Sequence, residues 1–267
     1  MQTIIRFFVA PSDVSGGLIH LCAEDTAHIR SLRLRPGELF TVCNGDGTDY
    51  ICCLSERDGG STAEIMEIQQ SNGESSVACS VYIAFAKGDR LDYAVQKSVE
   101  LGASDIVLFP SERCVAIPSD IPKKIARLQK IALETAMQCG RGRVPPVMAV
   151  ASLEMALMQA AQRSTGSCNS QSKIHNSQSM TYNAIRLSLF FYECEEELHL
   201  KQVLDQCNKR VDAVSIVTGP EGGFEPHEAE LAKSMGLAAV SLGSRILRCE
   251  TAPVVALAAV MFYTGNL

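Results

Sequence analysis

The sequence lacks the features that mark several large classes of protein. No apolar run approaches the roughly 20 residues that a membrane-spanning helix needs. The apolar residues of the opening M-Q-T-I-I-R-F-F-V are too few for a secretion signal, so we expect a cytoplasmic protein. The 11 cysteines include no C-x-x-C pair, so neither a zinc site nor a disulfide framework is expected. These absences favour reduced thiols, no bound metal and no membrane partner.

Common catalytic and nucleotide-binding motifs are missing too. The sequence contains no G-x-x-x-x-G-K-[S/T] phosphate loop, no G-x-S-x-G nucleophile elbow and no H-E-x-x-H zinc motif. A net charge of −6 argues mildly against a nucleic-acid partner. Yet the segment from Arg113 to Arg143 carries seven Lys or Arg residues against two acids. A local basic surface therefore remains compatible with RNA binding.

Two regions with different patterns are present. In residues 1–73, short β-rich runs are separated by G-G, N-G-D-G and D-G-G turns, and one helix is expected from about Asp25 to Leu34. This spacing is typical of a small antiparallel barrel. The polar segment S-N-G-E-S-S at 71–76 is the expected domain boundary. In residues 74–267, strands alternate with long helices, which predicts an α/β domain with a mostly parallel sheet covered on both faces.

One stretch of the second region has a different composition. Residues 163–182 are rich in Ser, Gln and Asn and poor in large apolar side chains. Such a segment cannot bury enough surface to order itself, so a flexible surface insertion is predicted.

Two glycine turns stand out between Ser215 and Pro253. The first is G-P-E-G-G-F at 219–224 and the second contains Gly243; each follows an expected strand and precedes an expected helix. Glycine allows positive φ and close approach of a ligand to the backbone. Ligands of open α/β sheets bind at the carboxyl ends of the strands. The two turns therefore predict a pocket lined by main chain, suited to a cofactor that supplies its own reactivity.

These motifs resemble the ribosomal RNA small subunit methyltransferase E family. The resemblance rests on G-P-E-G-G-F at 219–224 and on V-S-L-G-S-R-I-L-R-C-E-T-A at 240–252. Further similar segments are A-H-I-R-S-L-R-L-R-P-G-E at 27–38, K-G-D-R-L-D-Y-A-V-Q-K-S-V-E-L-G-A at 87–103, S-E-R-C at 111–114 and Q-K-I-A-L-E-T-A-M-Q-C-G-R-G-R-V-P at 129–145. Agreement at this many separate places covers nearly the whole chain.

The resemblance implies a fold and an activity. The fold is a PUA-like barrel followed by a SPOUT methyltransferase domain, whose C-terminal segment forms a trefoil knot, in an obligate homodimer. The activity is transfer of a methyl group from S-adenosylmethionine to N3 of a uridine in small-subunit (16S) ribosomal RNA, with the assembled subunit as the expected substrate.

The resemblance also implies site residues. The cofactor-binding positions carried over are Leu189, Thr218, Gly219, Glu221, Gly222, Leu242, Gly243, Ile246, Leu247 and Arg248. Uridine N3 carries a proton, so we expect Arg248 to stabilise the developing anion or orient the cofactor, and Glu250 to position Arg248 or accept the proton. A structural pair of Arg248 with Glu250 is the alternative. The expected RNA contacts are Arg6, Arg30, Arg33, Arg113, Arg141 and Arg143.

Besides the insertion at 163–182, two positions depart from the family pattern, and two alternative functions remain. Cys249 stands where a Thr is expected, and Glu225 stands where the family has a better helix N-cap such as Ser. The chain could instead be a non-catalytic RNA-binding assembly factor, against which the intact glycine motifs argue. It could also be a knotted methyltransferase acting on tRNA or on a ribose hydroxyl, against which the barrel-first order and the L-R-L-R segment argue.

Overall fold

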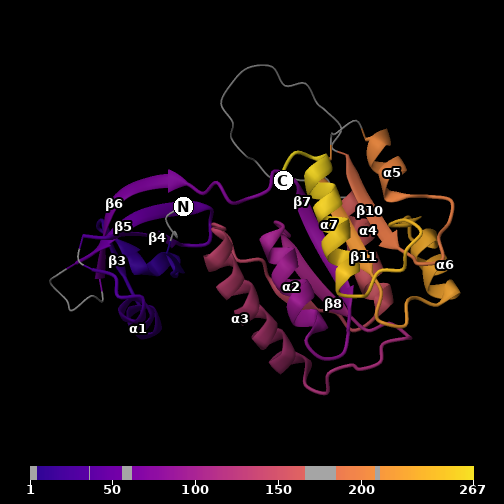
Figure 1. Cartoon of the computed structure of the whole chain (residues 1–267), viewed down its shortest axis with the longest axis horizontal. Coiled ribbons are helices and arrows are strands. Elements are labelled where there is room, and N and C mark those ends of the chain that lie inside the picture. The colour runs from indigo at the N-terminus through magenta and orange to yellow at the C-terminus, as the bar shows by residue number, and fades with distance from the viewer. Residues whose placement is uncertain (1–4, 36, 56–61, 166–184, 208–210) are drawn as a thin grey trace. The chain divides into compact units, whose positions relative to one another are not determined.

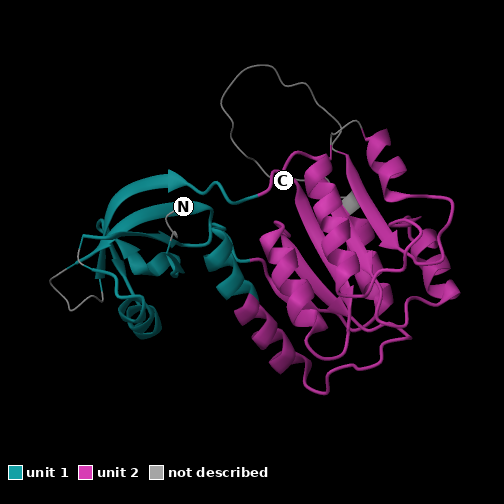
Figure 2. Cartoon of the chain, viewed as in Figure 1, with its two compact units in different colours: residues 1–74, 132–144 teal, residues 75–131, 145–267 magenta. Residues whose placement is uncertain are grey.

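The computed structural model describes residues 5–35, 37–55, 62–165, 185–207 and 211–267. The chain divides into two units, shown in Figures 1 and 2. One consists of residues 1–74 together with 132–144, and the other of residues 75–131 together with 145–267. The predicted insertion at 163–182 lies almost entirely outside the described residues.

The first unit is built on a six-stranded sheet in the order β1-β4-β5-β6-β3-β2. Strands β1 and β4 are parallel, and the other described pairs are antiparallel. Its elements are β1 (Arg6–Phe8), a 3-10 turn (Pro11–Asp13), β2 (Val14–Ser15), β3 (Leu18–His20), α1 (Ala23–Ser31), β4 (Leu39–Cys43), β5 (Thr48–Leu54) and β6 (Thr62–Gln70). Phe7, Ile19, Ile29, Phe40 and Val42 form the centre of its core.

A buried ion pair joins the first strand of this unit to β5. The Arg6 guanidinium donates to both carboxylate oxygens of Asp49, at 2.7 and 2.8 Å, and the Cys43 thiol donates to the same carboxylate. Burial alone would raise the pKa of Asp49, but the bonds from Arg6 and Cys43 lower it below its usual value. The Arg6 side chain is therefore committed to the interior of the unit.

A second carboxylate holds the glycine-rich loop after α3 (Ile121–Cys139). Glu74 accepts from the Arg141 guanidinium at 2.7 Å and from the amides of Gly142 and Arg143 at 3.1 Å each. The backbones approach so closely that a Cβ on Gly73 would lie 2.4 Å from the Gly140 carbonyl oxygen. Residues 132–144 thus belong physically to the first unit, a placement that the sequence patterns did not suggest.

The second unit is built on a six-stranded sheet in the order β12-β10-β11-β7-β8-β9, in which every described pair is parallel. Besides α3, its elements are β7 (Ala78–Ala84), α2 (Arg90–Glu100), β8 (Asp105–Phe109), β9 (Val147–Ala149), α4 (Leu153–Thr165), β10 (Arg186–Phe191), α5 (Leu200–Gln206), β11 (Ala213–Thr218), α6 (Pro226–Ser234), β12 (Ala238–Val240) and α7 (Thr251–Tyr263). The short β9 was not predicted.

Both faces of this sheet are covered, which explains why its strands are apolar throughout. Tyr82 and Phe109 pack with residues of α4 and α6. Successive side chains of a strand point to opposite faces, so neighbours such as Ile83 and Leu108 face the other side, where α2 and α7 lie together (Figure 1). The predicted α/β class with a parallel sheet covered on both faces is confirmed (Figure 1). Among the described residues, no helix is long and apolar enough to cross a bilayer.

Pairing across the sheet brings three strand ends to one level. Phe191, the last residue of β10, pairs with Thr218 of β11 on one side and with Val240 of β12 on the other. The two glycine turns follow β11 and β12, so the end of β10 lies between them. Strand order therefore assembles the two motifs into one site.

Removing Arg6 should leave an uncompensated buried charge. We expect Arg6→Ala to lower the free energy of unfolding at pH 7 by about 3–5 kcal/mol, whereas the exposed Arg35→Ala should change it by about 0.5 kcal/mol or less. Urea unfolding measures both. Because the pKa of Asp49 is lowered in the folded state, the stabilisation is present above the ordinary value of 3.8 and is lost as pH falls through the lowered pKa. An Arg6→Ala effect no larger than that of the control would contradict a structural role.

Candidate functional site

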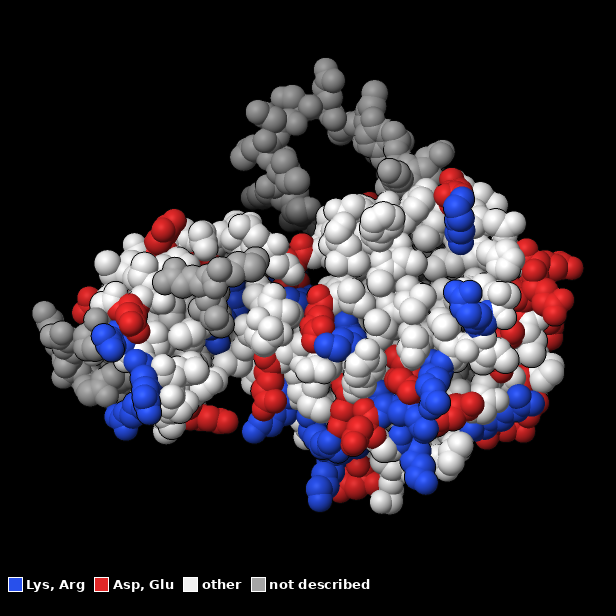
Figure 3. Space-filling view, in the orientation of Figure 1, with Lys and Arg blue, Asp and Glu red and all other residues white. Residues whose placement is uncertain are grey.

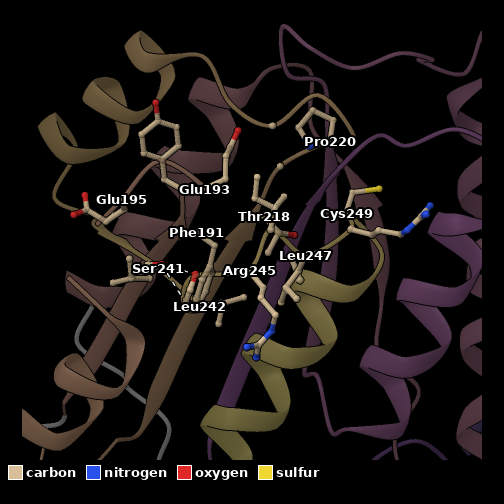
Figure 4. Close-up of a pocket in the computed structure, with 18 of the residues that line it drawn as sticks. Phe191, Glu193, Glu195, Thr218, Pro220, Ser241, Leu242, Arg245, Leu247 and Cys249 are labelled. Atoms are coloured by element: carbon tan, nitrogen blue, oxygen red, sulfur yellow. Dashed lines mark hydrogen bonds between the residues drawn. The ribbon is translucent and has the colours of Figure 1, made fainter. Parts of the chain in front are cut away.

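A pocket of about 780 Å³ lies at the carboxyl ends of β10, β11 and β12. Figure 4 shows side chains of both glycine turns converging on it, with Thr218 and Pro220 from the first and Leu242 and Leu247 from the second. Side chains that follow β10, including Glu193, complete the wall between the turns. This volume lies in the range of small-molecule and cofactor sites, about 300–1,000 Å³.

The first turn needs glycine because its backbone is tightly enclosed. A Cβ on Gly222 would lie 2.8 Å from Cβ of Arg113, and one on Gly223 would lie 1.6 Å from Oε1 of Glu193. Gly223 also has a φ of +70°, and the Glu193 carboxylate accepts from the Phe224 amide at 3.0 Å. The Phe224 ring packs on Phe190, with the ring centroids 4.2 Å apart, and this contact anchors the turn in the core of the sheet.

The S-E-R-C segment at 111–114 holds the same turn from outside. Arg113 donates through Nε to the Glu225 carboxylate at 2.6 Å and through Nη1 to the Gly222 carbonyl at 3.1 Å. Ser111 and the Glu112 amide donate to the buried Glu228 carboxylate at 2.9 and 3.0 Å. Glu225 thus serves as the partner of Arg113, which gives a physical use to the unusual helix N-cap.

The second turn, residues 241–250, presents its backbone to the pocket. Gly243 has a φ of +109°, and a Cβ there would meet no atom within 4 Å. The Gly243 amide donates to Oγ of Ser241 at 3.2 Å. The Arg248 carbonyl accepts from the amides of Thr251 and Ala252 at 2.8 and 2.9 Å, which begins α7. Glycine is needed here for backbone conformation rather than for space.

Arg90 links the two turns. Its guanidinium donates to Glu221 of the first turn at 2.6 Å and lies 3.6 Å from Glu250 at the end of the second. The Lys87 amide donates to the same Glu221 oxygen at 2.7 Å. Burial alone would raise the pKa of Glu221, but the bonds from Lys87 and Arg90 lower it below its usual value. Glu221 is therefore a brace in its ionised form.

Cys249 does not behave as a reactive thiol. Burial and the thiol's hydrogen bond to Glu250, at 3.2 Å, raise the pKa of Cys249 to about 12. The thiolate is the nucleophilic form of cysteine, and it is not populated near neutral pH at this position. Cys249 contributes a hydrogen bond to Glu250 instead.

Nine of the ten cofactor-binding residues carried over from the resemblance line this pocket. They are Thr218, Gly219, Glu221, Gly222, Leu242, Gly243, Ile246, Leu247 and Arg248. Leu189 does not: it is fully buried and pairs with Ile216 and Ala238, two residues short of the strand end. Phe191 and Tyr192 line the pocket in its place. The strand-end rule could have found them, because Phe191 is the last residue of β10 and Tyr192 follows it.

The two residues expected to take part in chemistry, Arg248 and Glu250, both line the pocket. In the described part of the chain, Glu250 pairs with Arg90 rather than with Arg248. Sequence reasoning missed Arg90, although it lies in the K-G-D-R segment that carried part of the resemblance. The available signal was its position where the loop that follows β7 meets α2, on the carboxyl side of a strand of the same sheet.

The expected RNA contacts divide into two groups. Arg6 and Arg141 are 7% and 3% exposed and are bonded to Asp49 and Glu74, so neither guanidinium is presented to a partner. The other four are exposed. Among these, Arg113 has its guanidinium bonded to Glu225 and to the Gly222 carbonyl. This leaves Arg30, Arg33 and Arg143 as candidates. Arg33 is the non-glycine residue with positive φ in the described chain, at 56°, and it follows Leu32, the C-cap residue of α1.

Family models match most of the chain. Residues 73–261 match an RNA methyltransferase domain and residues 21–65 an RNA methyltransferase PUA domain. The ribosomal RNA small subunit methyltransferase E of Bacillus subtilis is 31% identical over 254 residues, covering 92% of this chain and 91% of that protein. The protein of the same name from Synechocystis is 31% identical, covering 95% of this chain and 76% of that protein.

A solved structure extends the match to three dimensions. The ribosomal RNA small subunit methyltransferase E from Neisseria gonorrhoeae, bound to S-adenosyl methionine, superposes with a TM-score of 0.78 at 30% identity, and the match covers 97% of each chain. Sequence motifs, strand order and this superposition agree over both units. The chain belongs to the ribosomal RNA small subunit methyltransferase E family.

Proposed function

We propose that this protein is an S-adenosylmethionine-dependent methyltransferase that modifies N3 of a specific uridine in small-subunit (16S) ribosomal RNA, and so takes part in ribosome biogenesis. The observation that carries the proposal is the pocket formed by the two glycine turns, which joins G-P-E-G-G-F and R-I-L-R-C-E-T-A in one site. Membership of the family and the cofactor-bound relative support it.

The residues present fit this cofactor. The open backbone at Gly243 suits an adenine edge, and Leu242 and Leu247 offer an apolar wall. Glu193 and Glu195 bring negative charge to the rim of the pocket, which suits a ligand with a positive sulfur. Bound S-adenosylmethionine supplies an electrophilic methyl group on that sulfur, which remains as a neutral thioether after transfer.

The chemistry assigned to the protein concerns the acceptor. The proton of uridine N3 passes to the Glu250 carboxylate as N3 forms its bond to the methyl carbon. Arg248 faces the negative charge that develops on the ring. Arg90 and the Cys249 thiol hold the Glu250 carboxylate at the pocket wall. A bracing role of Arg248 toward Glu250 is less well supported, since Glu250 pairs with Arg90.

The direct test is methyl transfer to ribosomal RNA. We expect purified protein with the cofactor to methylate one uridine of small-subunit RNA that lacks the modification, as mapped by mass spectrometry, with the assembled subunit a better substrate than free RNA. Cofactor binding measured by calorimetry separates the alternatives. A non-catalytic assembly factor would bind RNA but no cofactor, and a methylated ribose or tRNA would assign the protein to another class of knotted methyltransferase.

Variants of the two proposed catalytic residues give the second test. We expect Arg248→Ala and Glu250→Gln to lower the single-turnover rate about a hundredfold or more. For Glu250→Gln the calorimetric affinity for the cofactor should be retained, because the carboxylate acts on the acceptor. Lys201→Ala, on the exposed face of α5, is the control. A folded Arg248→Ala protein with unchanged methyl transfer would exclude the catalytic role of Arg248.

Arg30, Arg33 and Arg143 remain the proposed RNA contacts. Figure 3 shows basic and acidic side chains interspersed over the visible face, so local contacts rather than net charge must guide the RNA. Arg143 also donates to the Asp46 carbonyl at 2.9 Å, which fixes the position of its guanidinium. Arg33 has a positive φ, a backbone conformation in which Asn or Gly is commoner than Arg.

We expect Arg33→Asn combined with Arg143→Ala to weaken RNA binding and to reduce the slope of log K against log salt by about 0.7–0.9 per lost contact. Asn tolerates the positive φ of position 33. Binding isotherms between low and moderate salt measure the slope, and Lys201→Ala serves as the control. Cofactor affinity should not change. An unaltered salt slope would remove both arginines from the interface.

We further propose that the protein is a homodimer and acts in the cytoplasm. The support for a dimer is α7, whose 13 residues carry no charge and leave Val255 and Phe262 exposed, at 38% and 76%. The surface around α7 is largely uncharged in Figure 3. Sedimentation equilibrium should therefore give a dimer, and a monomer at micromolar concentration would contradict it. The trefoil knot stays a prediction.

A further inference from the structure

A second pocket lies directly beside the candidate cofactor pocket. It is an open cavity of about 550 Å³ lined by Lys87, Gly88, Asp89, Arg90, Tyr93 and Glu250. Arg90 and Glu250 belong to the lining of both pockets. The two cavities therefore share a wall, and that wall contains the carboxylate proposed to receive the acceptor proton.

The segment 87–90, which lines the second pocket, is held in place by Glu221 of the first glycine turn. The Lys87 amide donates to Glu221 at 2.7 Å, and Arg90 donates to the same oxygen at 2.6 Å. Both ends of the segment 87–90 are thus fixed to the first glycine turn, while the Lys87 side chain itself is exposed. The anchored backbone thus fixes the base of an exposed lysine that lines the cavity.

Tyr93 supplies an aromatic surface to the same cavity. Its side chain is 47% exposed although it lies on the first turn of α2. The Lys97 ammonium lies 5.9 Å from the ring centroid, and this contact restrains the ring. Exposed aromatic rings beside cations are the elements with which proteins hold single unstacked bases.

We propose that the second pocket receives the acceptor nucleotide of the RNA, with the base stacked on Tyr93 and a flanking phosphate at Lys87. The inference rests on the proposed function, which it deepens by giving the acceptor a site of its own. A base on Tyr93 lies against the wall formed by Arg90 and Glu250, beyond which the cofactor pocket begins. The two reactants then enter from separate cavities and meet at Glu250.

The charges of the pocket favour one nucleotide over a longer stretch of backbone. Lys87 and Arg90 are balanced by Asp89 and Glu250, and Arg90 is already engaged with Glu221. Lys87 is the cation left to meet a phosphate in this cavity. A uracil N3–H is a donor suited to the Glu250 carboxylate, whereas cytosine offers only an acceptor at N3. The pocket thus favours uridine by hydrogen bonding.

The test compares Tyr93→Leu, Tyr93→Phe and Lys87→Gln with wild type in methyl transfer to unmodified small subunits. We expect Tyr93→Leu to lower kcat/KM for RNA about tenfold, because base–aromatic stacking is lost, while Tyr93→Phe stays within about twofold. Lys87→Gln should raise KM for RNA and make it less sensitive to salt. Lys201→Gln on α5 is the matched control for an exposed lysine.

Calorimetry with S-adenosylmethionine alone completes the design. All of these variants should keep the wild-type cofactor affinity, which also shows that the cofactor pocket is intact. Unchanged kcat/KM in Tyr93→Leu, or a parallel loss of cofactor affinity, would overturn the acceptor site while leaving the proposed function standing. A wild-type protein that binds cofactor but methylates no uridine would refute the proposed function, and the acceptor site would fall with it.

Discussion

The site depends on the hydrogen bonds that the Glu221 carboxylate accepts. Glu221 lies between Pro220 and Gly222, and it accepts from the Lys87 amide and from Arg90 through a single oxygen. Arg90 in turn reaches Glu250 at the start of α7. The segment 87–90, the first glycine turn and the start of α7 are thereby held around one cavity, although the first and last of them are more than a hundred residues apart in sequence. Without this carboxylate, Arg90 would lose its nearer partner and the wall between the two pockets would lose its support.

The two glycine turns of the pocket need glycine for different reasons. The first is crowded: Gly222 is packed against Arg113, and Gly223 against the carboxylate of Glu193. The second is open, and Gly243 is there for its φ of +109°. A crowded turn fixes the position of the cavity, whereas an open turn leaves backbone groups available to a ligand. The same residue type therefore has a structural use on one side of the pocket and a binding use on the other.

Much of this architecture could be predicted from the sequence because its signals are local. Turn residues, β-rich runs and helix ends are short-range features, and they correctly indicated the short strands and the helix of the first region and the alternation of strands and helices in the second. The residues expected next to the glycine motifs line the pocket. The sequence did not reveal contacts between residues far apart along the chain. The partner of Arg6 is 43 positions away in sequence, and that of Arg113 is 112 positions away. An arginine on a protein surface and one paired inside it look alike until the carboxylate beside it is known. Leu189 was expected at the pocket, but Phe191 lines it, because the register between strands decides which residue reaches the sheet edge.

Helix α3 has a consequence for how the molecule could be divided. Its residues up to Ile131 belong to the second unit, whereas Ala132 and the loop that Glu74 holds belong to the first. The first unit is therefore discontinuous in the chain, and no single cleavage can release it whole. A fragment ending at Glu74 would keep the carboxylate but lose the arginine and the two amides that it binds. Limited proteolysis between the units would yield pieces that are each incomplete, and exchange of the first unit between proteins would require two crossovers rather than one.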